Sequence, residues 1–329
     1  MTELRIGVIG AGVMGSGHVE YLSHHVPGVT VAAVCDTDTE RARALVERFS
    51  PEATVYADAR DMLSTGDFDG VVIASPDRFH AETVRWCLER AMPVLCEKPL
   101  AETLEEAEEI DHLHQAAIAA RGNRDLVHLG FMRRFDPAYT ELKKIIDSGE
   151  LGAALFAFAS TRNVSTPGIR TDQLITNISV HEIDVYRWLF ATEWESLEAH
   201  WLTPSRHASP GERDGVVLTG TLVNGVTVAA DIFANNSYGY DTRTEVTFEG
   251  GVFRMDTFGR VSVTQGAVQP DQPGGAMAEN WIPRFTPAYI EELRAWVAVV
   301  RGGEDKNLAT ITDAIRGLRA LDTISGRTP

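Results

Sequence analysis

A glycine-rich turn directly follows the first apolar run of the chain. It separates a predicted strand at residues 4–9 from a predicted helix at 13–25, and it reads Gly10-Ala11-Gly12-Val13-Met14-Gly15. In a Gly-x-Gly-x-x-Gly turn the first glycine permits the tight bend, the second admits a pyrophosphate, and the third allows close packing of helix on strand. The amides at the start of the helix then face the phosphates. An ordinary turn is the alternative. We predict a dinucleotide site at Gly10, Gly12, Val13, Met14 and Gly15.

An acidic residue stands where such a site needs one. Asp36 directly follows the second predicted strand, residues 29–35, and lies 21 residues after Gly15. A carboxylate there accepts hydrogen bonds from the adenosine ribose hydroxyls and repels a 2′-phosphate, so NAD is favoured over NADP. Arg41 and Arg43 lie nearby and could soften this preference. The alternative is an aspartate that only caps a turn.

A lysine follows a later predicted strand, residues 93–96, within the segment Glu97-Lys98-Pro99. In doubly wound sheets ligands bind beyond the carboxyl ends of the strands. Lys98 is therefore expected near the nicotinamide, where an ammonium group can stabilise negative charge on an alcohol oxygen. By itself, a lysine before a proline is more often a solvent-exposed charge.

A histidine and an asparagine share one face of a predicted helix at residues 176–190. Asn177 and His181 are four residues apart, and Asp184 lies near the same face. Hydrogen-bonding groups of this kind suit a ligand with several hydroxyls, and an imidazole can take up a proton near neutral pH. The alternative is a core histidine satisfied by a neighbour.

The composition excludes several classes of partner. The chain has 329 residues with 30 basic and 47 acidic side chains, a net charge of −17, which disfavours nucleic acid and anionic membranes. Its three cysteines form no Cys-x-x-Cys pair, so we expect no disulfide framework and no metal site. No secretory leader is visible, and no apolar run approaches the ~18 residues of a membrane span. We expect a cytoplasmic protein.

The predicted elements change character near residue 130. Before it, short apolar runs alternate with helices, which indicates an α/β fold with a doubly wound parallel sheet. After it, longer alternating runs and an Asn224-Gly225 turn indicate a mostly antiparallel sheet. A helix is expected to open at Thr286-Pro287, and residues 204–215 and 265–277 are expected to be loops. We predict a dinucleotide-binding domain at 1–130 and a substrate-binding and oligomerisation domain at 131–329.

Several segments together resemble the glucose–fructose oxidoreductase / inositol dehydrogenase / MocA (Gfo/Idh/MocA) family. They are Cys96-Glu97-Lys98-Pro99-Leu100, Ala74-Ser75-Pro76-Asp77 with His80, and His181-Glu182-Ile183-Asp184. Four further segments look most similar to the inositol 2-dehydrogenase branch: Gly130-Phe131-Met132-Arg133-Arg134-Phe135-Asp136, Arg162-Asn163, Tyr238-Gly239-Tyr240-Asp241 and Arg284-Phe285.

The resemblance implies a Rossmann domain followed by an α/β domain with a large open-faced sheet, a homo-oligomer (tetramer or dimer) built through that sheet, and a cis Lys98–Pro99 bond. It implies oxidation of a secondary alcohol of a cyclitol or sugar to a ketone between the domains, with hydride passing to C4 of NAD. Lys98 would hold the alcohol oxygen and His181 would take its proton. The implied cofactor contacts add Ser75, His80, Glu97 and Lys98. The implied substrate contacts are Lys98, Arg133, Asn163, Asn177, His181, Asp184 and Tyr240.

Two positions depart from the pattern of that branch. Asn177 stands where the family commonly has aspartate, and Thr161 stands where the branch often has histidine. Three alternatives to a cyclitol dehydrogenase remain: a dehydrogenase of a pyranose or glucoside, which these departures favour slightly, an NAD-dependent glycoside hydrolase, which the wider family includes, and an NAD-binding regulatory protein without catalysis.

Overall fold

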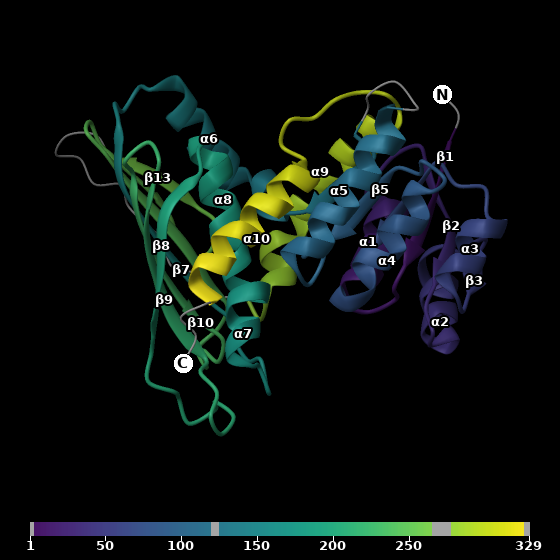
Figure 1. The fold of residues 1–329 in the computed structure, drawn as a ribbon, viewed down its shortest axis with the longest axis horizontal. Coiled ribbons are helices and arrows are strands. Elements are labelled where there is room, and N and C mark those ends of the chain that lie inside the picture. Colours follow the sequence, from purple (N-terminus) through teal and green to yellow (C-terminus); the bar gives the residue numbers. More distant parts are fainter. Residues whose placement is uncertain (1–2, 120–124, 265–277, 326–329) are drawn as a thin grey trace. The chain divides into compact units, whose positions relative to one another are not determined.

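The computed structural model describes residues 3–119, 125–264 and 278–325, and in it the chain forms two compact units (Figure 1). The first unit comprises Met1–Met132 and Tyr289–Ile315, and the second comprises Arg133–Ala288 and Arg316–Pro329. The single boundary expected after residue 130 lies next to the first crossing. The chain then returns to the first unit at Tyr289, which the sequence pattern did not reveal.

The first unit is built on a seven-stranded sheet in the order β14-β6-β5-β4-β1-β2-β3. Its strands β1 to β6 pair in parallel, and the short β14 joins β6 antiparallel. The elements are β1 (Leu4–Ile9), α1 (Val13–His25), β2 (Val29–Cys35), α2 (Thr39–Phe49), β3 (Thr54–Tyr56), α3 (Ala59–Thr65), β4 (Gly70–Ile73), η1 (Asp77–Phe79), α4 (His80–Leu88), β5 (Val94–Glu97), α5 (Leu104–Ala119), β6 (Val127–Gly130) and β14 (Ala309–Thr310).

The strands of this sheet are apolar, and two groups of helices pack beside them. β4, β5 and β6 are buried along their whole length, as parallel strands covered on both faces must be. Helix α1 contacts α2, while α4 contacts both α3 and α5. The predicted doubly wound α/β domain is confirmed.

The returning segment is part of the first unit through specific contacts. Helix α9 (Trp281–Val300) brings Tyr289 edge-on to His18 of α1, with ring centroids 6.1 Å apart. Further along, Arg301 donates to the carbonyl oxygen of Gly28 at 2.7 Å. Helix α10 (Ile311–Ser325) then leads back to the second unit.

The second unit is built on a seven-stranded sheet in the order β13-β12-β11-β7-β10-β9-β8. Its neighbours pair antiparallel except for the parallel pair of β7 and β10. The elements are η2 (Met132–Phe135), α6 (Pro137–Ser148), β7 (Ala154–Arg162), α7 (Thr171–Gln173), η3 (Leu174–Ser179), α8 (Val180–Phe190), β8 (Trp194–Trp201), β9 (Gly215–Leu222), β10 (Thr227–Phe233), β11 (Asp241–Phe248), β12 (Val252–Met255) and β13 (Val261–Thr264). This agrees with the predicted second domain fold.

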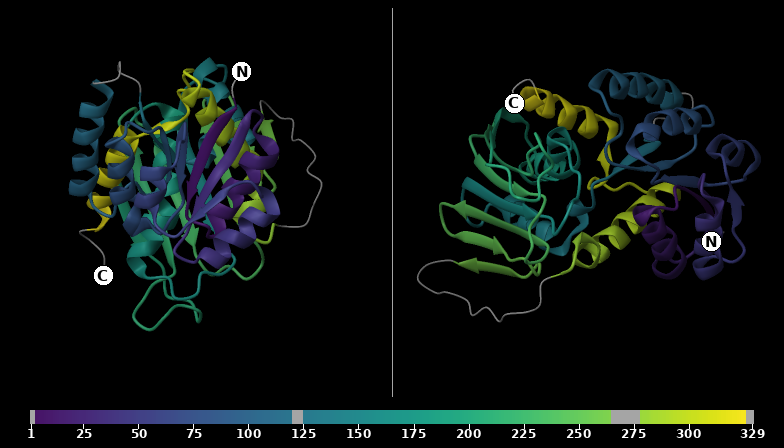
Figure 2. Two further views of the ribbon diagram at one scale, coloured as in Figure 1. Left: turned by 90° about the vertical axis from the view of Figure 1, so that its right-hand side faces the viewer. Right: turned by 90° about the horizontal axis from the view of Figure 1, so that it is seen from below.

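One face of the second sheet carries α6 and α8, and its other face is open in the part of the chain that the structure describes (Figures 1 and 2). The alternation along β7 follows this division. Ala157 and Ala159 are buried, whereas Phe156 and Phe158 are 39% and 37% exposed. The open face therefore presents aromatic side chains to its surroundings.

Two local sequence patterns differ in outcome: the turn predicted at Asn224-Gly225 is present, and the helix start predicted at Thr286-Pro287 is not. Gly225 of the expected hairpin has φ +89°, as an Asn-Gly turn requires. Thr286-Pro287 does not open a helix, because α9 begins at Trp281 and contains Pro287. The proline ring is accommodated within the first two turns, and the Thr286 hydroxyl donates to the Ile282 carbonyl at 2.8 Å. The loop expected at 265–277 lies outside the described residues. No described helix is long and apolar enough to span a membrane.

Candidate functional site

The glycine turn leaves space for phosphates at one position and is tightly packed at the other two. Gly10 has φ +100°, and a Cβ there would lie 2.4 Å from the Ala74 carbonyl oxygen. A Cβ on Gly15 would lie 1.8 Å from the carbonyl oxygen of Gly10. A Cβ on Gly12 would meet nothing within 4 Å. The space around each glycine fits the role that its place in the motif predicts.

The start of α1 is open to a ligand. Gly12 is its N-cap residue and provides no side-chain hydrogen bond to the first amides. Val13, in the first turn, is 63% exposed, and Met14 is half-buried. Uncapped amides at a helix N-terminus suit a phosphate group.

Asp36 is held in place by the turn and by an arginine. Its Oδ2 accepts from the Ala11 amide at 2.7 Å, and its Oδ1 accepts from Arg41 Nη2 at 2.8 Å. Burial disfavours the charge, but the bonds from Arg41, Ala11 and Asp38 outweigh it and lower the pKa of Asp36. The carboxylate is thus ionised beside the glycine turn, where a ribose would lie.

Ser75 lies on the loop beyond β4, and His80 is the first residue of α4. The His80 ring is 1% exposed, and its two nitrogens face the carbonyl oxygens of Ser75 and Pro99. The Ser75 hydroxyl is buried without a hydrogen-bond partner among the described residues. A buried hydroxyl of this kind suits a ligand atom that is supplied from outside the chain. His80 is expected to contact the cofactor, and in the structure both of its ring nitrogens face main-chain oxygens.

Lys98 follows the last residue of β5 and precedes a cis peptide bond to Pro99, as expected. Glu97, just before it, is buried and accepts from His18 Nε2 at 2.9 Å. His18 is a functional candidate that sequence reasoning missed. Its signal is its place on α1, three residues after Gly15, but its partner lies 79 residues away.

In the second unit, His181 and Asn177 come from adjoining pieces of one helical segment. His181 is in the first turn of α8 and is half-buried, and Asn177 is in the π-helix η3, also half-buried. The sequence predicted a single helix here and missed the π-helical turn. Such turns are frequent at functional sites.

Arg133 forms a buried ion pair with Glu182, the residue that follows His181. Arg133 and Glu182 are paired through Nη1 and Oε2, and each side chain is 2% exposed. The Thr161 hydroxyl also donates to Glu182, and Arg133 Nη2 donates to that hydroxyl at 3.2 Å. Burial opposes the charge of Arg133, but the Glu182 carboxylate holds the pKa of Arg133 above its usual value. Arg133 is thus engaged inside the unit.

Asp184 is engaged in the same way. Arg134 donates to both of its oxygens, from Nε at 2.9 Å and from Nη2 at 2.5 Å. Both side chains are at most 4% exposed. Two parallel bonds between a guanidinium and a carboxylate fix the orientation of both groups. Arg134 and Glu182 were not among the predicted site residues.

Asn163 and Tyr240 differ in accessibility. Asn163 is half-buried. Its backbone amide donates to the Phe233 carbonyl at 2.9 Å, and its backbone carbonyl accepts from the Asn236 amide at 2.7 Å. Tyr240 is 3% exposed and packs edge-on to Phe285, and burial raises the pKa of its phenol. Asn163 is therefore the more accessible of the two to a ligand.

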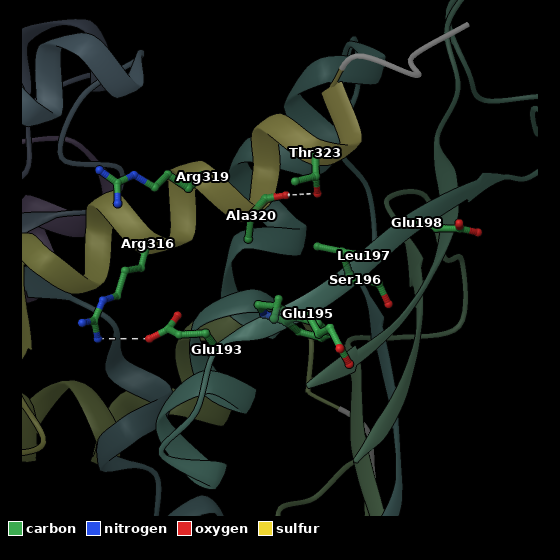
Figure 3. A pocket seen from close by; sticks show the side chains of 10 residues that line it. Glu193, Glu195, Ser196, Leu197, Glu198, Arg316, Arg319, Ala320 and Thr323 are labelled. Carbon is green, nitrogen blue, oxygen red and sulfur yellow. Dashed lines mark hydrogen bonds and ion pairs between the residues drawn. The ribbon is translucent and has the colours of Figure 1, made fainter. Parts of the chain in front are cut away.

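One open cavity of about 540 Å³ lies between β8 and α10 in the second unit (Figure 3). It is lined by charged side chains that include Glu193, Glu198 and Arg319, and Arg316 donates to Glu193 at 3.0 Å. A second cavity, of about 390 Å³, lies beside Asp136 and Arg284. None of the predicted site residues lines either of these two cavities.

The residues of the first unit fit NAD. Gly12 leaves room for phosphates, and the uncapped start of α1 provides donors for them. Asp36 is held as an acceptor for a ribose, and the Ser75 hydroxyl has no hydrogen-bond partner within the described ranges.

Comparison with known proteins gives the class to which this chain belongs. The model of the oxidoreductase family, NAD-binding Rossmann fold, matches residues 4–120, and that of the GFO/IDH/MocA C-terminal domain matches residues 139–254. The chain belongs to the Gfo/Idh/MocA family and is an NAD-dependent oxidoreductase. The predicted family, fold and cofactor are confirmed.

Within this family, the chain is similar to proteins that are named inositol dehydrogenases. The chain is 35% identical to inositol 2-dehydrogenase 2 of Paenarthrobacter aurescens (strain TC1) over 95% of this chain and 92% of that protein. It is 39% identical to inositol 2-dehydrogenase 2 of Saccharopolyspora erythraea over 92% and 86%. A crystal structure of myo-inositol dehydrogenase from Lactobacillus casei in complex with NAD(H) and myo-inositol matches with a TM-score of 0.87 and 29% identity, covering 99% and 94% of the two chains.

Proposed function

We propose that this protein is an NAD-dependent dehydrogenase that oxidises a secondary alcohol of a cyclitol to a ketone. The observation that carries the proposal is the similarity over both units to proteins named inositol 2-dehydrogenase, at 35% and 39% identity. The similar Lactobacillus casei enzyme was solved with NAD(H) and myo-inositol, which supports a polyol as the substrate.

Lys98 and His181 would carry the acid–base chemistry. Bound NAD supplies the redox step by accepting a hydride from the carbinol carbon. Lys98 donates a hydrogen bond to the alcohol oxygen and stabilises its developing negative charge. His181 takes the hydroxyl proton, a role that contributes about 10²–10⁴ in rate when the base is well positioned.

The remaining predicted residues divide by accessibility. We propose that Asn163 and Asn177, both half-buried, hydrogen-bond the other hydroxyls of the ring. Arg133 and Asp184 are engaged by Glu182 and Arg134, so we propose that they act by holding these partners in place, and Tyr240 packs against Phe285.

A substrate panel tests the proposal. Purified protein is mixed with NAD and with individual cyclitols, pyranoses and glucosides, and NADH is followed by its absorbance. We expect turnover with at least one cyclitol that exceeds turnover with every sugar. Best turnover with a pyranose would favour a sugar dehydrogenase, the alternative that Asn177 and Thr161 slightly favour. Aglycone release without net NADH would identify a glycoside hydrolase, and no reaction at all would leave a regulatory role.

Asn177 gives a second test of substrate choice. An amide cannot carry the negative charge of a carboxylate, but it can still bind a hydroxyl. We expect Asn177→Asp to raise the ratio of kcat/KM for myo-inositol to that for the best wild-type substrate. An unchanged ratio would show that Asn177 does not set specificity.

We further propose a homo-oligomer, a tetramer or a dimer, assembled through the open face of the second sheet, in the cytoplasm. The exposed Phe156 and Phe158 on that face support the assembly. Light scattering after gel filtration should show a multimer for the wild type and a smaller species for Phe158→Asp. A monomeric wild type would refute the assembly, and cell fractionation tests the compartment.

A further inference from the structure

His80 meets two hydrogen-bond acceptors inside the first unit. Its Nδ1 lies 2.7 Å from the carbonyl oxygen of Pro99, and its Nε2 lies 2.8 Å from the carbonyl oxygen of Ser75. A carbonyl oxygen can only accept, and a neutral imidazole has a single N–H. Both contacts are therefore hydrogen bonds only when the ring carries two protons.

His18 in the same unit shows the opposite pattern. Its Nε2 contacts Glu97 Oε1 at 2.9 Å, while its buried Nδ1 has no hydrogen-bond partner among the described residues. One proton on Nε2 satisfies that contact, and a second proton on Nδ1 would be buried without an acceptor. His18 contacts the residue before Lys98, and His80 contacts the residue after it. The surroundings of His18 require one N–H donor, whereas those of His80 require two.

A buried positive charge on His80 needs a negative charge nearby, and the Glu97 carboxylate provides it. Burial raises the pKa of the Glu97 carboxyl, but His18, then Lys98 and His80, outweigh burial, so this pKa is lowered and the group is ionised. Asp77 of η1 adds a second carboxylate near the start of α4. Lys98 and the positive N-terminal end of α4 oppose a charge on His80.

We propose that His80 is held as an imidazolium and is a positioning residue for Lys98. Its two N–H groups clamp the carbonyl of Pro99 to that of Ser75, on the loop beyond β4. On the other side of Lys98, Glu97 is anchored to α1 by His18. The residue before Lys98 and the residue after it are therefore both anchored by histidines, and the lysine main chain lies between them. This role rests on the function proposed for Lys98; the protonation state of His80 does not.

Nuclear magnetic resonance of the full-length protein labelled with ¹³C and ¹⁵N in histidine tests the charge directly. The His80 signals are assigned by their loss in His80→Gln. At neutral pH we expect both ring nitrogens of His80 to show the shifts and couplings of an imidazolium, while His128 shows those of a neutral ring. A neutral His80 ring would overturn the proposal, whether or not any substrate is turned over.

Kinetics test the positioning role. Glutamine at position 80 cannot donate in both directions, so we expect His80→Gln to lower kcat by about tenfold to 100-fold, the size expected from a misplaced catalytic group. The dissociation constant of NAD, measured by fluorescence, should change much less. His128→Gln, which alters another buried histidine of the same unit, is the matched control for lost stability. If the two variants lose equal stability and equal kcat, His80 has no positioning role, even with a charged ring.

Discussion

Arg133 and Glu182 form an ion pair in which each side chain is only 2% exposed. Removing one member of a buried pair leaves an uncompensated charge and costs about 3–5 kcal/mol. We expect Arg133→Met to lower the free energy of unfolding by this amount, and Glu182→Gln by less, because an amide can still accept from arginine. Chemical denaturation measures both. If Arg133→Met is as stable as the wild type and instead raises the KM of the substrate, then Arg133 contacts substrate and is not structural.

Lys98 and His181 should be the two residues whose loss stops turnover without loss of the cofactor. We expect Lys98→Ala and His181→Ala each to lower kcat by about 10²–10⁴, the range for positioned acid–base groups. His181→Ala should also flatten the acidic side of the pH–rate profile. Affinity for NAD should stay near that of the wild type.

Lys144→Ala offers a matched control, since that lysine is 75% exposed in a surface pair with Glu141. Surface pairs contribute little, so this variant should behave as the wild type. Near-native kcat in Lys98→Ala or in His181→Ala would remove that residue from the mechanism.

Asp36 and Arg41 should together decide the choice of cofactor. The Asp36 carboxylate is bonded to Arg41 at 2.8 Å and would repel a 2′-phosphate, whereas Arg41 alone would attract one. We expect Asp36→Ser to shift the ratio of kcat/KM for NADP to that for NAD by about 100-fold, or about 2.8 kcal/mol. The added change Arg41→Ala should reverse much of this shift. Equal use of NAD and NADP by the wild type would contradict the role of Asp36.

His128 should make the fold sensitive to acid. Burial lowers its pKa from 6.5 to about 4, so the unfolded chain binds the proton more tightly than the folded one. Stability should therefore fall as the pH drops from about 6.5 toward 4, by up to about 3 kcal/mol, at about 1.4 kcal/mol for each pKa unit. Denaturation curves across this range should show a weaker dependence on pH in His128→Gln. An identical dependence would show that other groups cause the acid sensitivity.

Features that depend on neighbouring residues could be predicted from the sequence. The glycine turn, Asp36 at the end of β2, and the Asn224-Gly225 hairpin are each set by a few adjacent residues whose backbone requirements are known. The change from a parallel to a mostly antiparallel sheet was also readable, because strand and helix patterns differ in period.

Features that depend on distant partners could not be predicted in this way. His18 meets Glu97 across 79 residues, and Arg133 meets Glu182 across 49, and no local pattern reports such pairs. The same holds for the return of Tyr289 to the first unit and for β14. At α9 the local signal was misleading, because the preference of proline for a first turn did not set the helix start, which lies upstream at Trp281.

Transfer of deuterium tests the central claim, that this protein oxidises a cyclitol by passing a ring hydrogen to NAD. The wild type is incubated with NAD and with myo-inositol, or the best cyclitol of the panel, that carries deuterium on every ring carbon. Mass spectrometry of the product should show one deuterium in each NADH and one ketone formed for each NADH. NADH that contains no deuterium, or no NADH from any cyclitol, would contradict the claim.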